Sequence, residues 1–410
     1  MIFKKPRNIQ ISHSFTIRIN FIKNIPISFQ PLISKFTMAS DLPPTHRALV
    51  LETMEDGFHV QTVPTPQPGL GNAIIRIAAG GIISYHREVY NGGRSYNFPK
   101  PIVGGVSAIG RIAALGPDST ALELGQLVFV DCMIRSRDDP DDQFLSAIHE
   151  GMTPGSRKLI RDVWRDGTWA EYAKFPLENC FALDEERLCR GLGYKIPDLL
   201  YMCHLLVAYG GFRDIRLEPG ETVIVAPATG GYGGAGVMTA VAMGARVIAV
   251  GRNEKELVRL KELVQKGSPH NAGIETVRLT GDEVADASAM KAFGPVDAVL
   301  DFSPPHAAKS SHLKNAILAL RRGGRASLMG WNEAVAVSAP YIISRNITMK
   351  GKLMYEREDI LHFIKMLERG LFPRGKNFVD TKVFKLEDWK EALDVGADHT
   401  GIGKFVAFTP

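Results

Sequence analysis

The feature that most restricts the fold of this chain is a regular alternation of apolar and helical segments after residue 200. Apolar segments of strand length occupy 222–226, 246–250, 275–279, 296–301 and 326–329. Helices are expected up to Met243, at 254–266 and at 308–321, and the second keeps its leucines on one face. Strands that are apolar throughout are typical of a parallel sheet covered on both faces. We therefore predict an α/β fold with a doubly wound parallel sheet, in which 347–355 would form a sixth strand.

The first half of the chain has a different pattern, with short strand-like segments separated by glycine and proline. Between residues 44 and 181 these segments are HRALVLE, FHVQTV, NAIIRIAA, SAIGRIAAL, QLVFVDCM and WAEYAKF. Such a series predicts an all-β domain, which we interpret as a partly open barrel. A polar insert at 135–166 is too long for a turn and is expected to be a loop that forms a lobe or lid. The final segment, 356–410, is too short for a domain and is expected to pack back onto the first one.

The charge balance and the cysteine content argue against several classes of binding partner and site. Six of the 49 basic residues lie in 1–37, which holds no acidic residue, so 43 basic residues face 44 acidic ones in the rest of the chain. This balance gives no electrostatic argument for nucleic acid or membrane partners. No apolar run approaches the roughly 18 residues of a membrane span. The four cysteines form no C-x-x-C pair, which argues against a disulfide framework and against a structural zinc site.

The first 44 residues are expected to form an extension outside the folded domains. The basic, serine-containing stretch 1–37 is typical of a mitochondrial transit peptide, although Pro26 and Pro31 would interrupt a helix. Met38 opens MASDLPPTHRALVLE, which is typical of a natural start, so a mispredicted start codon is the other explanation. The first explanation predicts a mitochondrial location and the second a cytoplasmic one, and both stay open here.

A glycine cluster, IVAPATGGYGGAGVM at 224–238, follows the first strand of the alternating series and precedes a helix. In that context glycines let backbone N–H groups approach a dinucleotide's diphosphate, and the amino end of the helix favours negative charge. The pattern fits Gly231-x-Gly233-x-x-Gly236, but the alternative 228–233 leaves a full helix before Gly244 and is preferred. The predicted cofactor-binding residues of the cluster are Thr229, Gly230, Gly231, Tyr232 and Gly233.

The end of the next strand predicts which nucleotide binds. An acidic residue there would accept a hydrogen bond from the ribose 2′-hydroxyl of NAD, but this chain has Gly251, Arg252 and Asn253. Glycine leaves room for a 2′-phosphate, and a guanidinium pairs with it through charge-assisted hydrogen bonds of about 1.5–3 kcal/mol. We therefore predict NADP(H) as the cofactor, preferred over NAD(H) about ten- to hundredfold.

The order of these parts, together with their motifs, resembles the medium-chain dehydrogenase/reductase superfamily, which includes alcohol dehydrogenases and quinone oxidoreductases. The resemblance covers 45–408 and rests on PGETVIVAPATGGYGG, GGVSAIGRIAALGPDSTALELGQLVFV, DGTWAEYAKFP, VDAVLDFS and RRGGRASLMG. It implies a GroES-like catalytic domain formed by 45–203 and 355–410, and a Rossmann NADP-binding domain at 204–354. It also implies a small-molecule substrate and a homo-oligomer formed through the edge strand of the nucleotide-binding sheet.

The chain departs from the zinc-dependent members of this family at their ligand positions. Those members have a Cys-His pair where this chain has Ile83-Ser84, and Gly-His-Glu where it has 104–106, Gly-Gly-Val. The closely spaced cysteines of their structural zinc lobe are also missing. Because an alkyl group, a hydroxyl and glycine do not replace thiolate, imidazole and carboxylate, the comparison implies a zinc-free member.

The resemblance also implies site residues. Tyr85 stands where zinc-dependent members carry the hydroxyl of a proton relay, and Tyr96, in GGRSYNFPKP, resembles the acid of some enoyl reductases. These two are the predicted catalytic residues, with Arg94 as a weaker candidate for substrate binding. Met329, Gly330 and Trp331 stand where family members contact the nicotinamide end of the cofactor.

Zinc-free members resemble quinone and enoyl reductases, in which hydride passes from NADPH to an activated double bond. A conjugated carbonyl spreads the developing charge, so a hydrogen-bond donor and a proton source suffice. We therefore predict a zinc-independent, NADPH-dependent reductase of an enone, quinone or reactive ketone. Two alternatives remain: a metal-free alcohol dehydrogenase or ketone reductase, and an NADPH-binding sensor without catalysis.

Overall fold

The computed structural model describes residues 42–267, 273–307, 310–331 and 337–410. The predicted N-terminal extension therefore lies outside the described residues except for 42–44. Within the described part of the chain, no helix has both the length and the apolar character that a membrane crossing requires.

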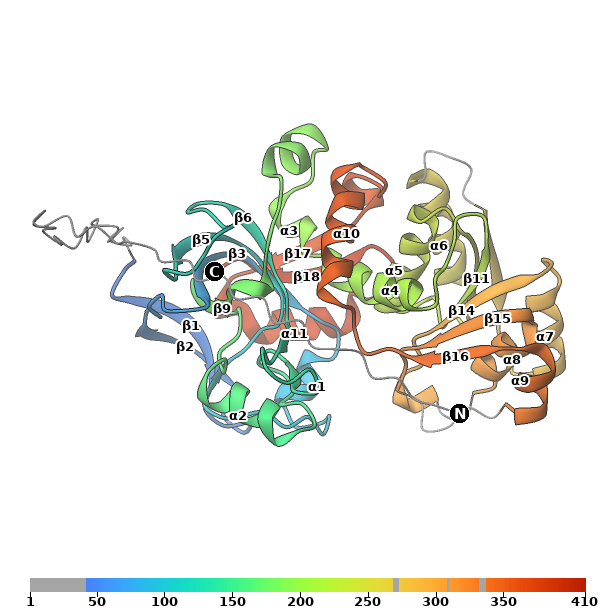
Figure 1. The fold of residues 1–410 in the computed structure, drawn as a ribbon, viewed down its shortest axis with the longest axis horizontal. Helices are drawn as coiled ribbons and strands as arrows, with labels where there is room; N and C mark the ends of the chain where they lie inside the picture. The colour runs from blue at the N-terminus through green and yellow to red at the C-terminus, as the bar shows by residue number, and fades with distance from the viewer. Residues whose placement is uncertain (1–41, 268–272, 308–309, 332–336) are drawn as a thin grey trace, which may run out of the picture. The chain divides into compact units, whose positions relative to one another are not determined.

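A six-stranded, fully parallel sheet has the order β13-β12-β11-β14-β15-β16 (Figure 1). Its strands are β11 (Thr222–Ala226), β12 (Arg246–Gly251), β13 (Ile274–Arg278), β14 (Val296–Asp301), β15 (Leu320–Leu328) and β16 (Thr348–Gly351). The predicted doubly wound sheet, including its sixth strand, is confirmed. The strand order reverses between β11 and β14, and the carboxyl ends at such a point are where open α/β sheets bind ligands.

Helices cover both faces of the sheet (Figure 1). One face carries α4 (Met202–Asp214), α5 (Gly231–Ala242) and α6 (Glu254–Gly267), and the other α7 (Glu283–Lys291), α8 (His312–Ala319) and α9 (Ala339–Arg345). Both faces need a cover because the strands are apolar on both sides. In β11, Val223 and Val225 pack on the first face, whereas Ile224 packs on the second. The helix predicted at 308–321 is wrong at its carboxyl end, because Leu320 already pairs with Val296 as the first residue of β15.

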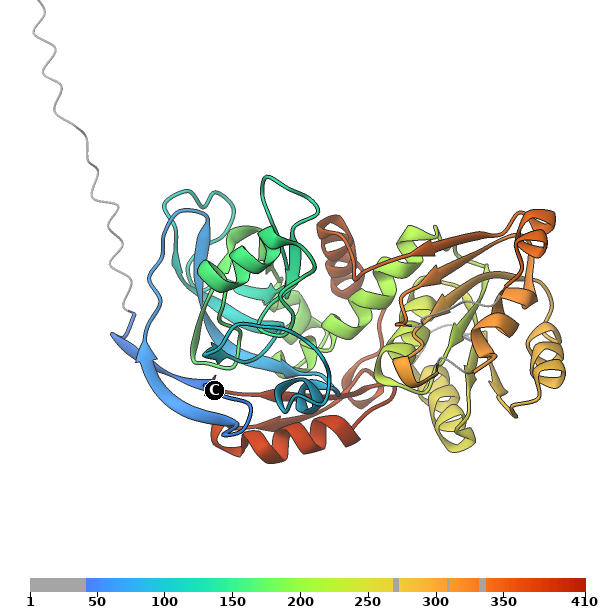
Figure 2. The ribbon, with the colours of Figure 1, turned by 90° about the horizontal axis from the view of Figure 1, so that it is seen from below.

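The all-β part consists mainly of a seven-stranded sheet in the order β10-β6-β5-β3-β18-β17, with β9 also paired to β3, and a three-stranded sheet β2-β1-β4. The strands are β1 (Thr45–Leu51), β2 (Phe58–Pro64), β3 (Asn72–Ile82), β4 (Ile102–Val103), β5 (Ala108–Leu115), β6 (Leu127–Val130), β9 (Tyr172–Pro176), β10 (Cys180–Ala182), β17 (Asp380–Phe384) and β18 (Lys404–Phe408). β18 runs antiparallel to β3, with Val406 opposite Ile82. The carboxyl-terminal segment, including α10 (Arg357–Glu368) and α11 (Trp389–Asp398), thus returns to the first part of the chain, as Figure 2 shows for β18 and α11.

The insert at 135–166 is more ordered than the plain loop expected from its polarity. It contains the hairpin β7 (Met133–Arg135) and β8 (Gln143–Leu145) and the helix α2 (Pro154–Asp162). Thr153 caps α2 by accepting a hydrogen bond from the Ser156 backbone N–H at 3.1 Å, and it donates one to Asp142 at 2.5 Å. Asp142, which belongs to the acidic run of the insert, therefore supports a helix cap.

A buried carboxyl group makes the stability of this fold depend on pH. Asp131, 1% exposed, accepts hydrogen bonds from the Tyr355 hydroxyl at 2.7 Å and from the Met133 backbone at 3.2 Å. Burial raises the pKa of Asp131 to about 6. The folded protein then holds this proton more tightly than the unfolded chain, so the free energy of unfolding falls by about 2 kcal/mol as the pH rises from 4 to 7.

Asp131→Asn is expected to remove this pH-dependent contribution, whatever constant cost the amide adds. Urea midpoints of the wild type and the variant should be compared at pH 4.5 and 7.5, with Asp162→Asn, an exposed aspartate of α2, as the control. An unchanged difference between the wild-type and Asp131→Asn midpoints at the two pH values would mean that Asp131 does not titrate in this range.

Candidate active site

The predicted nucleotide cradle is a short loop between the carboxyl end of β11 and the amino end of α5. Gly230 is the N-cap of α5, with φ −85° and ψ 175°, and accepts a hydrogen bond from the Gly234 N–H at 2.8 Å. The first N–H groups of a helix have no partner within it, so those of Gly231 and Tyr232 are available to a ligand. A Cβ placed on Gly230 would meet nothing within 4 Å. The backbone at this point is therefore accessible to an incoming group.

The remaining glycines of the cluster are packed against protein. A Cβ on Gly233 would clash with the Pro227 carbonyl oxygen, and one on Gly234 would lie 2.6 Å from Ile402. At Gly236 the nearest atom would be a Phe302 ring carbon at 3.2 Å. The closest backbone approach thus occurs at Gly233, a residue that both candidate patterns share.

The residues at the end of β12 are arranged differently from the expectation. A Cβ on Gly251 would lie 2.7 Å from the Thr229 methyl group, so this glycine accommodates Thr229 in the structure. Arg252 is exposed. Asn253 lies immediately before α6, where its carbonyl accepts a hydrogen bond from the Leu257 N–H at 3.0 Å and its side chain accepts one from the Glu256 N–H at 3.3 Å. Asn253 therefore has a capping role independent of any cofactor.

The structure brings the two predicted catalytic tyrosines together. Tyr85 is the N-cap of α1 (His86–Tyr90), and its ring centroid lies 6.2 Å from that of Tyr96 in an edge-to-face arrangement. The Arg94 guanidinium lies 4.3 Å from the Tyr85 ring centroid and 5.6 Å from that of Tyr96. His149, from the insert, packs edge-on against Tyr96 at 4.9 Å. The tyrosines and Arg94 form one cluster, which we call the tyrosine cluster.

Tyr232 joins the tyrosine cluster to the nucleotide cradle. It belongs to the first turn of α5, and it lines one small cavity with Ser84, the residue before Tyr85. Burial raises the pKa of the Tyr85 phenol, the neighbouring Tyr96 raises it further, and Tyr232 and Arg94 oppose the shift. Burial also raises the pKa of Tyr232. Both phenols are therefore protonated at neutral pH, next to the amino end of α5.

Met329, Gly330 and Trp331 are held to the carboxyl end of β14. The Met329 N–H donates to the Asp301 carbonyl at 3.1 Å, and the Trp331 N–H donates to the Ser303 carbonyl at 2.8 Å. A Cβ on Gly330 would lie 2.5 Å from an Asp301 carboxylate oxygen. The Trp331 indole is 69% exposed. These three residues are therefore positioned by the loop after β14, and not by the segment that carries the tyrosine cluster.

The same edge of the sheet holds a buried polar chain that the sequence analysis missed. Ser303 donates to Asp301, the Ser303 hydroxyl lies 2.7 Å from His312 Nε2, and His312 Nδ1 lies 2.7 Å from the Ser310 hydroxyl. Burial lowers the pKa of His312, and the Arg252 guanidinium lowers it further. Asp301, at the end of an apolar strand, was the only sign of these hydrogen-bonded side chains in the sequence. They support the loop next to Gly330.

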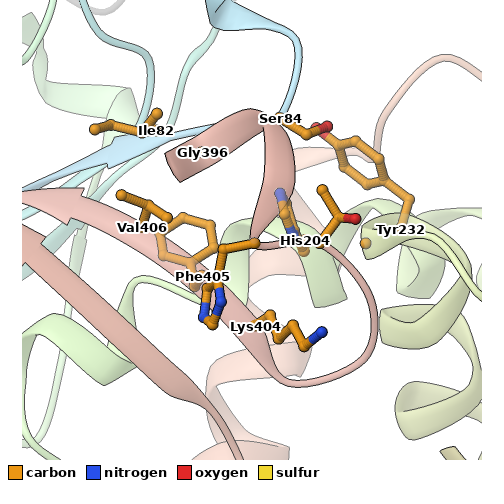
Figure 3. A pocket seen from close by; sticks show the side chains of 11 residues that line it. Ile82, Ser84, His204, Tyr232, Gly396, Lys404, Phe405 and Val406 are labelled. Carbon is orange, nitrogen blue, oxygen red and sulfur yellow. The ribbon is translucent and has the colours of Figure 1, made fainter. Parts of the chain in front are cut away.

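A second missed residue is His204, in the almost wholly buried helix α4. Its ring lies 4.5 Å from that of Tyr232 and 5.0 Å from that of Phe405. His204, Tyr232 and Ser84 line the same small cavity (Figure 3). A lone histidine in an apolar helix was the sequence signal, but such a residue is usually structural.

Comparisons with known proteins agree with this geometry. Residues 69–185 match the family described as alcohol dehydrogenase GroES-like domain, and 231–369 match the family described as zinc-binding dehydrogenase. Alcohol dehydrogenase 1 of Caenorhabditis elegans is 25% identical over 354 residues, which cover 86% of this chain and 93% of that protein.

Solved structures share the fold at lower identity. An alcohol dehydrogenase from E. coli CFT073, in complex with NADH, superposes with a TM-score of 0.71 at 17% identity, covering 90% of this chain and all of that one. A crotonyl-CoA carboxylase/reductase in complex with NADP superposes with a TM-score of 0.68 at 16% identity, covering 90% and 95%. The chain belongs to the medium-chain dehydrogenase/reductase superfamily and is an oxidoreductase of that family.

Proposed function

We propose that this protein is a zinc-independent, NADPH-dependent oxidoreductase that reduces an activated C=C or C=O bond of an enone, quinone or reactive ketone. The observation that carries the proposal is that Tyr232, in the first turn of α5, lines one small cavity with Ser84, the residue before Tyr85, so that the tyrosine cluster lies beside the nucleotide cradle. The proposed domains are 45–203 with 355–410 for the substrate and 204–354 for the cofactor.

The proposed cofactor site uses residues that follow three strands of the parallel sheet, β11, β12 and β15. When bound, NADPH supplies the hydride. Thr229, Gly230, Gly231, Tyr232 and Gly233 would hold the diphosphate at the amino end of α5, where the helix dipole favours anions. Arg252 would pair with the 2′-phosphate next to Asn253, while Met329, Gly330 and Trp331 would line the nicotinamide end. The open backbone at Gly230 supports this placement.

The residues at the family's zinc positions do not fit that metal. Ile83 and Ser84 offer an alkyl group and a neutral hydroxyl, which are poor zinc ligands. Where zinc-dependent members carry imidazole, this chain has Gly105, and a Cβ there would lie 2.5 Å from the Trp169 ring. Trp169 thus occupies the space that an imidazole would need, and Val106 stands in the place of the carboxylate. The proposed reaction therefore has no step at a zinc ion.

The tyrosine cluster would supply the proton and stabilise the developing charge. A protonated phenol at Tyr85 or Tyr96 donates a hydrogen bond to the substrate oxygen as negative charge forms there. The Arg94 guanidinium, held over both rings, adds positive potential at the same place. Because Tyr85 is half-buried, this hydrogen bond would act in a medium of lower dielectric constant than water, where it is stronger.

The test of the proposed function is NADPH oxidation, followed at 340 nm, with matched panels of enones, quinones and unconjugated ketones. Turnover restricted to conjugated or otherwise activated carbonyls is expected. Reversible reduction of simple ketones would favour the metal-free alcohol dehydrogenase, a candidate supported by the similarity to alcohol dehydrogenase 1 of C. elegans. Tight NADPH binding with no turnover in any panel would favour a sensor.

Arg252→Ala is expected to abolish the preference for NADPH. Loss of a charge-assisted pair to the 2′-phosphate should weaken NADPH binding about ten- to hundredfold and leave NADH binding within about twofold. Nicotinamide fluorescence titrations with both nucleotides measure the ratio. Arg190→Ala, which removes an 80% exposed arginine outside the sheet, is the control. An equal loss for both nucleotides would show that Arg252 does not read the 2′-phosphate.

A further inference from the structure

A buried histidine beside the cradle has no role in the function proposed above. His204 is 6% exposed, and neither of its ring nitrogens has a hydrogen-bond partner. Burial lowers the pKa of His204 to about 3, so the ring is neutral at physiological pH and carries one N–H donor. Buried polar groups are nearly always hydrogen-bonded, and each exception needs an explanation.

The position of His204 points to a ligand at the amino end of α5. The imidazole lines a small cavity together with Gly231 and Tyr232, the first residues of that helix (Figure 3). A Cβ on Gly231 would lie only 3.7 Å from His204 Nδ1. The cavity holds about 10 Å³, the space of one oxygen-sized group. A nicotinamide ring is too large for it, whereas a single oxygen of a larger ligand fits.

The chemistry of the lining suits an anionic oxygen. The side chains of Lys404, Ser84 and Thr400 also line the cavity, and no carboxylate is among its lining residues in the described part of the chain. Lys404 lies 4.0 Å from Glu256, which is itself 3.6 Å from Arg259. The amino end of α5 and a neutral N–H donor therefore border one small space, and both favour an anionic oxygen there.

We propose that His204 donates a hydrogen bond to an oxygen of the cofactor's diphosphate and so fixes that group at the amino end of α5. This inference rests on the proposed use of NADPH. It makes His204 a positioning residue for the cofactor, supplied by α4 rather than by the glycine cluster. It also explains why a buried imidazole stays without a protein partner: its partner arrives with the nucleotide.

The test compares three ligands by isothermal titration calorimetry on the full chain: NADPH, adenosine 2′-phosphate 5′-diphosphate and adenosine 2′-monophosphate. His204→Phe keeps the size of the ring and removes the donor. It is expected to weaken the first two ligands about ten- to hundredfold and to leave the third unchanged, because only the third lacks the diphosphate. His204→Asn, which keeps an N–H donor, should recover part of the loss.

Thermal unfolding separates this role from a structural one. His204→Phe should unfold at the same temperature as the wild type or higher, because it removes a buried polar group without a partner. His46→Phe is the matched control, since His46 is also 6% exposed with an unpartnered Nδ1 but lies in β1; it should not alter the affinity for any of the three ligands.

Two results would overturn the inference while leaving the proposed function intact. One is unchanged affinity of His204→Phe and His204→Asn for all three ligands. The other is a loss confined to NADPH, which would place the contact on the nicotinamide or its ribose. A wild-type protein that binds neither NADPH nor the diphosphate would instead refute the proposed cofactor, and the inference with it.

Discussion

Tyr85→Phe is expected to lower kcat by about 10²–10⁴-fold, the usual contribution of a positioned general acid. The ring, and hence its packing against Arg94 and Tyr96, is retained, so the dissociation constant of NADPH should stay within about twofold. Stopped-flow measurement of NADPH oxidation with a conjugated enone gives kcat, and fluorescence titration gives the affinity. The expected split between turnover and binding is the signature of a proton donor, as opposed to a residue that only shapes the site.

Two further variants define which tyrosine acts. Tyr96→Phe should have the larger effect if Tyr96 is the donor and Tyr85 only orients it across the 6.2 Å that separates their rings. Tyr172→Phe, a partly buried tyrosine of β9, is the control and should behave as the wild type. Full turnover of the Tyr85→Phe, Tyr96→Phe double variant would exclude both phenols as the proton source.

Gly233→Ala is expected to be the most destabilising single change in the glycine cluster. The added methyl group would clash with a backbone atom, the Pro227 carbonyl oxygen, which has no rotamer into which to move. Overpacking of this kind costs about 1–3 kcal/mol and more where backbone must shift. Urea or thermal unfolding measures the effect, and failure to obtain folded protein would agree with it.

Alanine substitutions at two other glycines of the cluster, Gly230 and Gly236, provide the comparison for Gly233→Ala. Gly230→Ala has space for its methyl group, so it should fold as the wild type and affect only nucleotide affinity. Gly236→Ala meets side-chain atoms of Phe302, Leu300 and Val225 at 3.2–3.3 Å, and the gain in helix propensity offsets part of that crowding. If Gly236→Ala proved more damaging than Gly233→Ala, the clash with the Pro227 carbonyl oxygen would not be the dominant cost in this cluster.

The parallel sheet was predictable because its strands are buried on both faces, which leaves an unmistakable apolar pattern in the sequence. α7 was not expected, since only Asp286 and Met290 of its nine residues are buried and its sequence shows little periodicity. The order in the insert was missed for a related reason: a cap at Thr153 and one buried apolar residue, Ile160, hold α2 in a polar context. Elements with few buried residues depend on contacts that a sequence pattern does not reveal.

The sequence predicted individual residues of the candidate site, but not how they lie relative to one another. Tyr85 and Tyr96 were chosen by resemblance, but their approach around Arg94 and the link to Tyr232 depend on how distant segments pack. Gly251 was expected to make room for a phosphate, and in the structure it makes room for Thr229. His204 was overlooked because its importance lies in missing hydrogen bonds, which only a folded structure displays.

The pairing of β18 with β3 determines the order in which this protein is completed during synthesis. β3 leaves the ribosome before any strand of the parallel sheet, whereas its partner strand β18 is made after that whole sheet. Until then one edge of β3 is without its strand, and such edges are prone to pair with other chains. The seven-stranded sheet can therefore be completed only after the parallel sheet has been made, so under the proposed function a nascent chain would acquire its nucleotide site before its active site is whole.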